Sequence, residues 1–326
     1  MPLYLSHRSA LDYWRSHPVD GQRISYSRGK AVFAPKRDCD PCEVLQDLVG
    51  LTPDLFRFPI HVLVPDKSLR IRSKHVVSHI WQGPVPSNSF AVASKSKEVY
   101  VASIELCFVQ MGESSDFRKL ICLGDEFCGS YSIRNSSSQG FVNRAALSSA
   151  SKIGTYLAAV RGVHGISVAR RALRYVIDGS ASPMETIVVV LLCLPCSLGG
   201  YGIPWPNLNY RIAPSWAMAQ MVEKSSYVCD LCWPEARFSI EYDSDFWHTG
   251  SLRIDRDSRR RNALLSLGFE VMTLTKGQVF EYRAFDRFAR QVAKCLGYRL
   301  RENVADCDAR RLELRSLLFG LINDPL

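Results

Sequence analysis

The chain has 326 residues, 47% of them hydrophobic and 22% charged, a globular composition with room for two domains that excludes a disordered chain. Its net charge of +9 favours a polyanionic partner such as DNA. The longest apolar run, Ile187 to Cys196, is too short to cross a bilayer, so we expect no association with a membrane.

Residues 1–138 are predicted to form a small α+β or mostly β module. A short amphipathic helix is expected from Ser9 to Arg15. The CDPC turn at Cys39 and Cys42 is interpreted as an ordinary loop, because no second pair of zinc-ligand spacing lies nearby. Four short segments are rich in strand-forming residues: Phe58 to Val64, Arg70 to His79, Ser89 to Val92 and Glu98 to Ile104.

A Ser- and Gly-rich run, Arg134 to Gly140, is the predicted boundary of this module. Two helices are expected after it, roughly Asn143 to Val160 and Ile166 to Ile177, and they make residues 139–180 a helical connector. Four arginines give this pair a basic face, which is either a solvated surface or a surface that steers nucleic acid. They are Arg161, Arg170, Arg171 and Arg174.

Ser182 and Pro183 begin an apolar helix that is expected to run to Leu194. Glu185 lies in its first turn, where the helix dipole stabilises a carboxylate, so a structural role explains this residue completely. The alternative is that Glu185 points from the helix into a site shared with acids further along the chain. The pattern supports both interpretations equally.

Two short apolar runs, Tyr227 to Trp233 and Arg237 to Tyr242, are separated by Pro234 and predict a β-hairpin. Each run contains an acid, Asp230 in the first and Glu241 in the second. Carboxylates buried among apolar neighbours are costly unless a cation holds them. The two acids therefore predict a divalent-metal site.

The remaining elements complete a domain over residues 181–300. The order after Pro183 is helix, three strands, helix, strand and helix, which predicts an α/β sandwich around a small mixed sheet. Residues 301–326 are expected to close the chain with a helix. The further elements are a strand at Asn207 to Ile212, a helix at Asp255 to Leu267, a strand at Phe269 to Thr275 and a helix at Glu281 to Leu296.

Carboxylates that lie close together repel one another and are pushed toward protonation unless a cation neutralises them. Oxygen-only ligands suit Mg²⁺ or Mn²⁺. A metal held by Asp230 and Glu241, with Glu185 as a third ligand, would polarise a phosphoryl oxygen and lower the pKa of bound water. His248 either exchanges a proton with that water or the leaving oxygen, or packs in the turn beside Trp247.

Two CxxC pairs occur in this half of the chain, Cys193 with Cys196 in the apolar helix and Cys229 with Cys232 around Asp230. Such pairs are typical of zinc sites. Residues three apart on a strand point to opposite faces, so we interpret these cysteines as structural thiols. With 11 cysteines, an odd number, we expect no disulfide framework and a reducing, cytoplasmic compartment.

Arginines crowd the start of the helix that follows the hairpin. They predict either a solvated basic face or a surface that binds phosphates and supplies the positive charge missing from the strands. The residues expected to contact nucleic acid are Arg256, Arg259 and Arg260, together with Lys276 just after the last strand.

These residues together resemble the PD-(D/E)XK superfamily, in particular the branch of Vsr, the very-short-patch mismatch repair endonuclease, and its bacterial relatives. A Ser-Pro-x-Glu helix often lies upstream in those relatives and is matched by Ser182 to Glu185. The resemblance covers roughly Ile166 to Leu296. The matching positions of the relatives' pattern are Asp230, Pro234, Glu241, Asp243, His248, Asp257, Arg260, Leu264, Gly268 and Thr275.

The resemblance implies a restriction-endonuclease-like α-β-β-β-α-β core, with Mg²⁺ or Mn²⁺ as cofactor and DNA as substrate. By the resemblance, Asp230 and Glu241 are metal ligands, Glu185 is an auxiliary acid and His248 is a general acid or base. The chain departs from the pattern at Asp243, which stands where the motif has lysine and joins the predicted catalytic residues. The usual Asp-Gly is Asp243-Ser244.

The N-terminal half resembles the body of AbiEi-type antitoxins over Leu3 to Arg15 and Phe58 to Gly129. Such domains often precede nuclease-like domains in bacterial proteins. The sequence thus predicts a metal-dependent DNA endonuclease in bacterial defence, repair or a toxin–antitoxin setting. The alternative is a DNA-binding regulator or antitoxin that keeps the nuclease fold without its chemistry. A zinc-stabilised interaction module is a third interpretation, and the oligomeric state is left open.

Overall fold

The computed structural model describes residues 2–16, 57–81, 85–94, 98–134, 137–216, 218–243, 251–301 and 306–323. The chain divides into two compact units, one running from Met1 to Asp178 and the other from Gly179 to Asn323. Residues 139–178, expected as a connector, belong to the first unit, and the closing helix belongs to the second. The CDPC turn lies outside the described residues. None of the described helices is long and apolar enough to cross a membrane.

The first unit contains a five-stranded sheet in the order β3-β2-β1-β5-β4. The central strand β1 runs parallel to β5 and antiparallel to β2. Helix α1 (His7–Ser16) follows β1 directly and buries Leu11 and Trp14. Each of the four segments expected to be strand-rich contains one strand of this sheet. The strands are β1 (Leu3–Leu5), β2 (Ile60–Val64), β3 (Val76–Ile80), β4 (Phe90–Ser94) and β5 (Val99–Ala102).

A group of helices completes the first unit, so this module is α+β and the mostly β alternative was wrong. Ser103 and Asp116 cap α3 and α4 by accepting hydrogen bonds from backbone N–H groups of the first turns. Helix α3 packs close to α6 at Gly165, whose φ is 79° and where an added Cβ would lie 2.2 Å from the carbonyl oxygen of Val109. The remaining elements are α3 (Ile104–Ser114), α4 (Phe117–Cys128), β6 (Tyr131–Ile133), β7 (Phe141–Asn143), α5 (Ala150–Ala159) and α6 (Ile166–Leu173).

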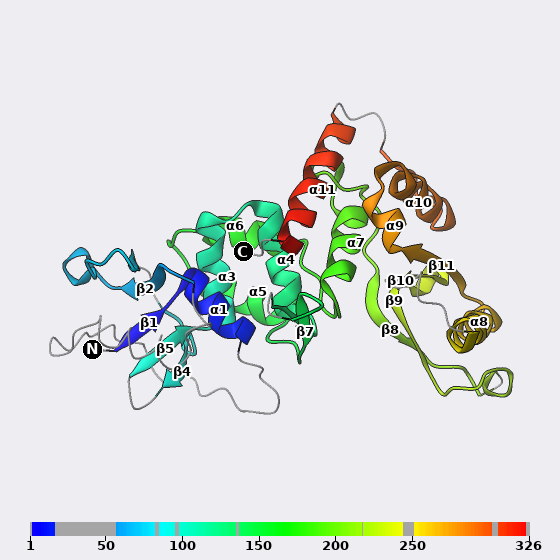
Figure 1. Cartoon of the computed structure of the whole chain (residues 1–326), viewed down its shortest axis with the longest axis horizontal. Coiled ribbons are helices and arrows are strands. Elements are labelled where there is room, and N and C mark those ends of the chain that lie inside the picture. Colours follow the sequence, from blue (N-terminus) through cyan, green and yellow to red (C-terminus); the bar gives the residue numbers. More distant parts are fainter. Residues whose placement is uncertain are drawn as a thin grey trace. The chain divides into compact units, whose positions relative to one another are not determined.

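The second unit is built around a four-stranded sheet in the order β11-β10-β9-β8 (Figure 1). Strands β8, β9 and β10 are antiparallel neighbours, whereas β10 and β11 are parallel. The predicted hairpin and the mixed sheet are both confirmed. The strands are β8 (Asn207–Ile212), β9 (Tyr227–Trp233), β10 (Phe238–Asp243) and β11 (Glu270–Thr275).

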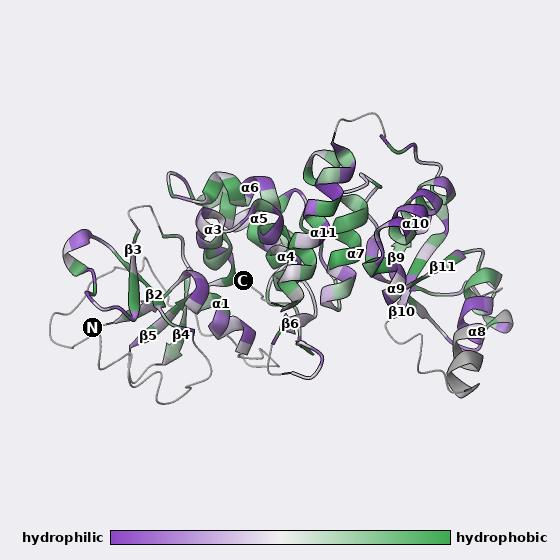
Figure 2. Ribbon diagram, turned by 45° about the horizontal axis from the view of Figure 1, so that its top comes forward, coloured by the Kyte–Doolittle hydropathy of each residue, from purple (hydrophilic) through white to green (hydrophobic). Residues whose placement is uncertain are grey.

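The helices of this unit follow the predicted order of helix, three strands, helix and strand. Helix α7 is almost entirely hydrophobic, whereas α8 carries a strongly hydrophilic stretch (Figure 2). Ala263 and Leu264 of α8, with Leu267 just after it, pack against Tyr227 and Cys229 of β9, so α8 lies against the sheet beside the strand that carries Asp230. The helices are α7 (Pro183–Cys193), α8 (Ser251–Ser266), α9 (Lys276–Phe280), α10 (Tyr282–Cys295) and α11 (Cys307–Asn323).

One disulfide joins Cys196 to Cys307, across 111 residues. The interpretation of Cys196 as a structural thiol was therefore wrong. Cys196 also lies beyond the end of α7, in a short 3-10 turn that α11 contacts. The pairing could not be predicted from the sequence, because it depends on the docking of α11 next to that turn.

Candidate functional site

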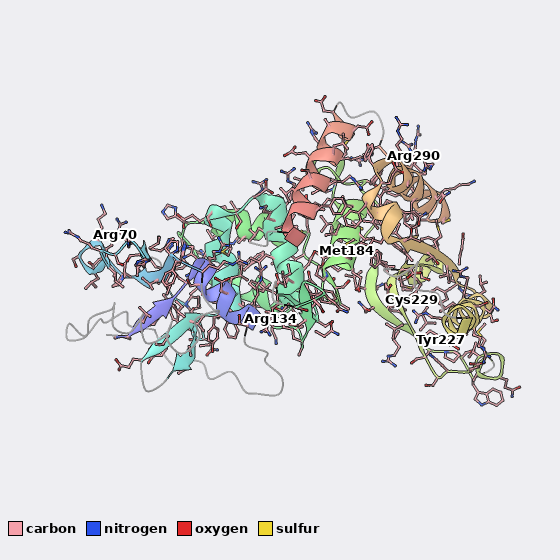
Figure 3. The ribbon with its side chains drawn as sticks, in the orientation of Figure 1. Arg70, Arg134, Met184, Tyr227, Cys229 and Arg290 are labelled. Carbon is pink, nitrogen blue, oxygen red and sulfur yellow. A yellow bond between two sulfur atoms is a disulfide. The ribbon has the colours of Figure 1, made fainter. Side chains whose placement is uncertain are left out.

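The three predicted acids come from three elements of the second unit, Glu185 from the first turn of α7, Asp230 from β9 and Glu241 from β10. Met184 and Cys229, labelled in Figure 3, mark the start of α7 and the position on β9 next to Asp230. Strands β9 and β10 pair through Leu231 and Ile240, which directly follow Asp230 and directly precede Glu241. The backbone N–H of Tyr242 donates to Oδ2 of Asp230 at 2.8 Å.

Glu185 is held in place by hydrogen bonds to both of its carboxylate oxygens. Its Oε1 accepts from the hydroxyl of Ser182 at 3.0 Å, and its Oε2 accepts from the backbone N–H of Ala181 at 2.8 Å. Ser182 in turn accepts from the backbone N–H of Glu185, as expected for the N-cap residue. The structural interpretation of Glu185 is therefore correct. Burial raises the pKa of this side chain, and the negative charge of Asp230 adds to that effect.

Asn209 on β8 joins this network and was missed from the sequence. Its side-chain amide donates to Oε2 of Glu185 at 2.8 Å and to the carbonyl of Gly179 at 2.9 Å. Its φ is 47°, in the left-handed region that asparagine tolerates better than most residues. An asparagine in the middle of a strand is unfavourable by propensity alone, and that is the signal by which it could have been found.

Arg260 on α8 supplies the positive charge next to the strand acids. Its Nη2 donates to Oε1 and Oε2 of Glu241 at 2.8 and 2.7 Å, and also to the carbonyl of Val228. Both side chains are partly buried, with exposed fractions of 34% for Arg260 and 21% for Glu241. From the sequence we expected a cation beside Asp230 and Glu241. Arg260 of the chain itself supplies that positive charge.

The electrostatics tie the three acids into one cluster. Burial raises the pKa of Glu185, and Asp230 raises it further. Burial raises the pKa of Asp230, against the opposing effects of the Tyr242 N–H and Arg260. Burial also raises the pKa of Glu241, again with Asp230 adding to it and Arg260 opposing it. Asp230 is therefore the central member, since it is coupled to both other carboxylates.

The other predicted residues are distributed around this cluster. Asp243 ends β10, where it pairs in register with Thr275, and Lys276 follows Thr275 directly, so Asp243 and Lys276 lie at the same end of the sheet. Arg259 is exposed and forms an ion pair of 3.4 Å with Glu223. His248 and the side chain of Arg256 lie outside the described residues.

The fit of a metal depends on how many carboxylates are available. Within the described part of the chain, no group of three or more His, Cys, Asp or Glu side chains is arranged to hold a metal ion. The carboxylate oxygens of Glu185 already accept hydrogen bonds from the helix cap and from Asn209, so this side chain is not free to serve as a third ligand. Asp230 and Glu241 remain as a pair of oxygen donors. Mg²⁺ commonly uses only one or two carboxylates together with water and substrate phosphates, so the pair suits it.

The neighbouring cysteines are buried thiols. Cys229 and Cys232 have no exposed surface, and burial is the main reason that their pKa values are raised to about 12. Cys193 is also a buried free thiol. Cys229 and Cys232 lie in the apolar cluster that includes Leu264, as expected of structural thiols.

The comparisons with known proteins give distant relatives only. Two uncharacterised proteins, from two strains of Mycobacterium tuberculosis, are each 29% identical to this chain over 146 residues. The match covers 45% of this chain and 48% of each relative, so it spans about half the length of the relatives. No protein-family model matches the chain, and no solved structure matches it.

Proposed function

We propose that the chain is a metal-dependent DNA endonuclease that uses a restriction-endonuclease-like core in its second unit. The observation that carries the proposal is the coupled cluster of Glu185, Asp230 and Glu241, gathered from a helix and two paired strands. A protein gains no stability from placing three carboxylates with raised pKa values together. Such clusters are characteristic of functional sites.

The order of elements supports the same proposal. The second unit has the sequence helix α7, strands β8, β9 and β10, helix α8 and strand β11. This is the α-β-β-β-α-β order expected of a core that resembles Vsr. The strand acids adjoin the paired residues Leu231 and Ile240, and α8 brings Arg260 to Glu241.

A surface for DNA is supported by residues around the cluster. Trp216, in the connection between β8 and β9, is 89% exposed. Met218 and Val222 of the same connection pack against the apolar cluster that includes Leu264 of α8, so the exposed ring projects from an anchored segment. Exposed aromatic rings stack on nucleobases, and neighbouring arginines bind phosphates. Arg259 and Lys276 supply positive charge nearby.

In the proposed reaction each group has a separate part. Asp230 and Glu241 would hold the metal, which supplies polarisation of a phosphoryl oxygen and a more acidic water. Glu185 and Asn209 fix α7 and β8 around Asp230, so they position that carboxylate. Arg260 compensates the negative charge of Glu241 until DNA and metal arrive, and is then placed to contact a phosphate oxygen.

The assay is DNA cleavage by the purified full chain. Supercoiled plasmid, single-stranded DNA and mismatched duplex are each incubated with Mg²⁺, with Mn²⁺ and with EDTA. The proposal predicts nicking or cutting of at least one substrate with either metal and none with EDTA. Absence of cleavage from every substrate with both metals would remove the enzyme function.

The second candidate is a DNA-binding regulator or antitoxin that keeps the fold without the chemistry. Two observations favour it: Arg260 already engages both oxygens of Glu241, and Asp243 stands where the motif has a lysine. This candidate predicts salt-dependent DNA binding without cleavage. It also predicts a midpoint of thermal unfolding that does not change with Mg²⁺, whereas a metal-binding site is stabilised by its metal.

A further inference from the structure

Three histidines of the first unit meet at the edge of its sheet. His7 is the first residue of α1, His61 is on β2 and His79 is on β3. The ring nitrogens His61 Nδ1 and His79 Nε2 are 2.8 Å apart and share one hydrogen bond. The ring of His7 stacks on that of His79, with the ring centroids 3.6 Å apart. The three rings form one continuous cluster made by segments far apart in the sequence.

The charges around this histidine cluster are mainly positive. Arg8 lowers the pKa of His61, and Arg70, labelled in Figure 3, lowers that of His79, in both cases after burial as the main cause. Among the described residues, a carboxylate of α3 approaches the cluster: Glu113, half-exposed, has Oε2 3.9 Å from Nε2 of His7. Asp12 lies near Arg8, but burial raises the pKa of Asp12. Its carboxyl is therefore less able to balance the positive charge of Arg8.

Two buried hydrogen-bond donors beside the histidine cluster lack an acceptor within the described part of the chain. They are Nε of Arg8 and Nε2 of Gln110. Gln110 is 1% exposed, and its other amide atom, Oε1, accepts from the backbone N–H of His7 at 3.0 Å. A buried donor without an acceptor is costly and calls for a partner. The missing partner is therefore an acceptor.

A metal ion does not fit this place. A metal lies in the plane of each imidazole that binds it, whereas the rings of His7 and His79 are stacked with their planes only 20° apart. One ion cannot lie in two nearly parallel planes that are separated in this way. The nearby arginines would also repel a cation. Imidazole and guanidinium donors around an unmatched positive charge suit an anion with several oxygens.

We propose that His61 and His79, with Arg8 and Arg70, form a binding site for a phosphate group in the first unit. The site is separate from the acid cluster of the second unit and does not depend on the proposed nuclease activity. In the free protein the histidines are largely neutral, since the pKa of His79 is lowered to about 4 and that of His7 to about 2, mainly by burial. A bound anion favours protonation of the His61–His79 pair, so binding takes up a proton. The pair gains one positive charge, because its two facing nitrogens share a single proton.

The test is isothermal titration calorimetry of the full chain with inorganic phosphate at pH 6.5, in EDTA. Wild type is expected to bind at one site. His61→Gln and His79→Gln are expected to weaken binding at least tenfold, because each removes one ring of the pair that takes up the proton. The matched control is His75→Gln, since His75 is exposed in the connection between β2 and β3 and should bind like wild type.

The proton uptake is tested with sulfate, whose charge does not change between pH 6 and pH 8. Affinity should fall as pH rises, by up to tenfold per pH unit for each proton taken up. If the glutamine variants unfold, NMR titration of the wild-type histidines replaces them, and phosphate should raise the pKa of His61 and His79. The proposal is overturned if wild type binds no phosphate, if both variants bind like wild type, or if phosphate leaves those two pKa values unchanged.

Two ligands distinguish whether the bound phosphate group belongs to nucleic acid or to a small molecule. A dinucleotide with only an internal phosphodiester represents nucleic acid, and inorganic phosphate represents a small metabolite group. Stronger binding of the dinucleotide, lost in His79→Gln, assigns the site to nucleic acid. Stronger binding of inorganic phosphate, lost in the same variant, assigns it to a free phosphate group. Both results support the phosphate site.

Discussion

A single nitrogen of Arg260, Nη2, donates to both carboxylate oxygens of Glu241, 2.8 Å from Oε1 and 2.7 Å from Oε2. The acid that a metal would need is thus neutralised by the helix packed beside it. In the proposed enzyme, Arg260 would offset the repulsion between Glu241 and Asp230 in the absence of metal, and a bound ion would take over that role.

Replacing Arg260 by glutamine should destabilise the metal-free protein. Glu241 and Asp230 would then repel each other without compensation, at a cost of about 1–3 kcal/mol in the free energy of unfolding, since both side chains are only partly buried. Mg²⁺ should recover more stability in Arg260→Gln than in wild type. Urea unfolding in EDTA and in Mg²⁺ measures both effects.

The matched control for that experiment is Arg259→Gln on the same helix. Arg259 pairs with Glu223 at 3.4 Å, with both side chains more than half exposed, so its loss should change stability by less than about 1 kcal/mol. Equal effects of the two substitutions would show that Arg260 has no special part in the acid cluster.

The pH dependence of stability follows from the raised pKa values of the three acids. A carboxyl whose pKa is higher in the folded state holds its proton where the unfolded chain has released it. Stability therefore falls as pH rises from about 4, the unfolded value, through the folded pKa values, and stays lower above them. The acid cluster should lower the free energy of unfolding most at neutral and alkaline pH.

Asp230→Asn should remove much of this cost, because Asp230 raises the pKa of both Glu185 and Glu241. The asparagine oxygen can still accept from the N–H of Tyr242. In EDTA at pH 8 the variant should be more stable than wild type by roughly 0.5–2 kcal/mol. The difference should shrink toward pH 4. Urea unfolding at several pH values checks it, and a variant that is less stable than wild type at pH 8 would contradict it.

Asn209→Asp should have the opposite effect. It removes the donor to Oε2 of Glu185 and adds a fourth negative charge beside the cluster. We expect a loss of about 2–3 kcal/mol at pH 8 and a smaller loss at pH 5, where the carboxyls are partly protonated. The control is Asn207→Asp, at an exposed position of the same strand, which should be nearly neutral. Equal losses at positions 207 and 209 would argue against the network.

The disulfide between Cys196 and Cys307 should contribute measurably to the free energy of unfolding. It closes a long loop, 111 residues apart in sequence, and such bonds typically contribute about 2–4 kcal/mol by restricting the unfolded chain. Cys307→Ser should lower the urea midpoint under oxidising conditions. A reducing agent should bring wild type to the same midpoint. If wild type and variant already agree without reductant, the bond does not form in solution.

Much of the second unit could be predicted, because its elements carry local signals. Ser182 and Pro183 mark the start of α7, Pro234 separates the strands of the hairpin, and Asp230 and Glu241 stand out as acids in apolar runs. These are one-dimensional features that chain spacing and propensity capture. The paired strands and the mixed sheet followed from them.

The partners of these acids could not be predicted, because they depend on packing. Arg260 was expected to contact nucleic acid and lies against Glu241, since Leu264, one turn later on α8, anchors that helix on β9. Asn209 reaches Glu185 only because of its left-handed backbone. Helix α3 escaped notice for a different reason: it is apolar on nearly every face and gives a weak helical period. Helix α4 separates polar from apolar residues at helical spacing, so its pattern could have been found from the sequence.

The most direct test of the central claim is the rate of plasmid nicking by Glu241→Gln in Mg²⁺. The substitution keeps the shape of the side chain and removes the charge that would bind the metal. We expect the rate to fall at least about 100-fold from wild type, because the metal contributes several kcal/mol. Glu235→Gln, at an exposed glutamate in the turn of the same hairpin, should nick at the wild-type rate. Nicking by Glu241→Gln at the wild-type rate would contradict the assignment of the site.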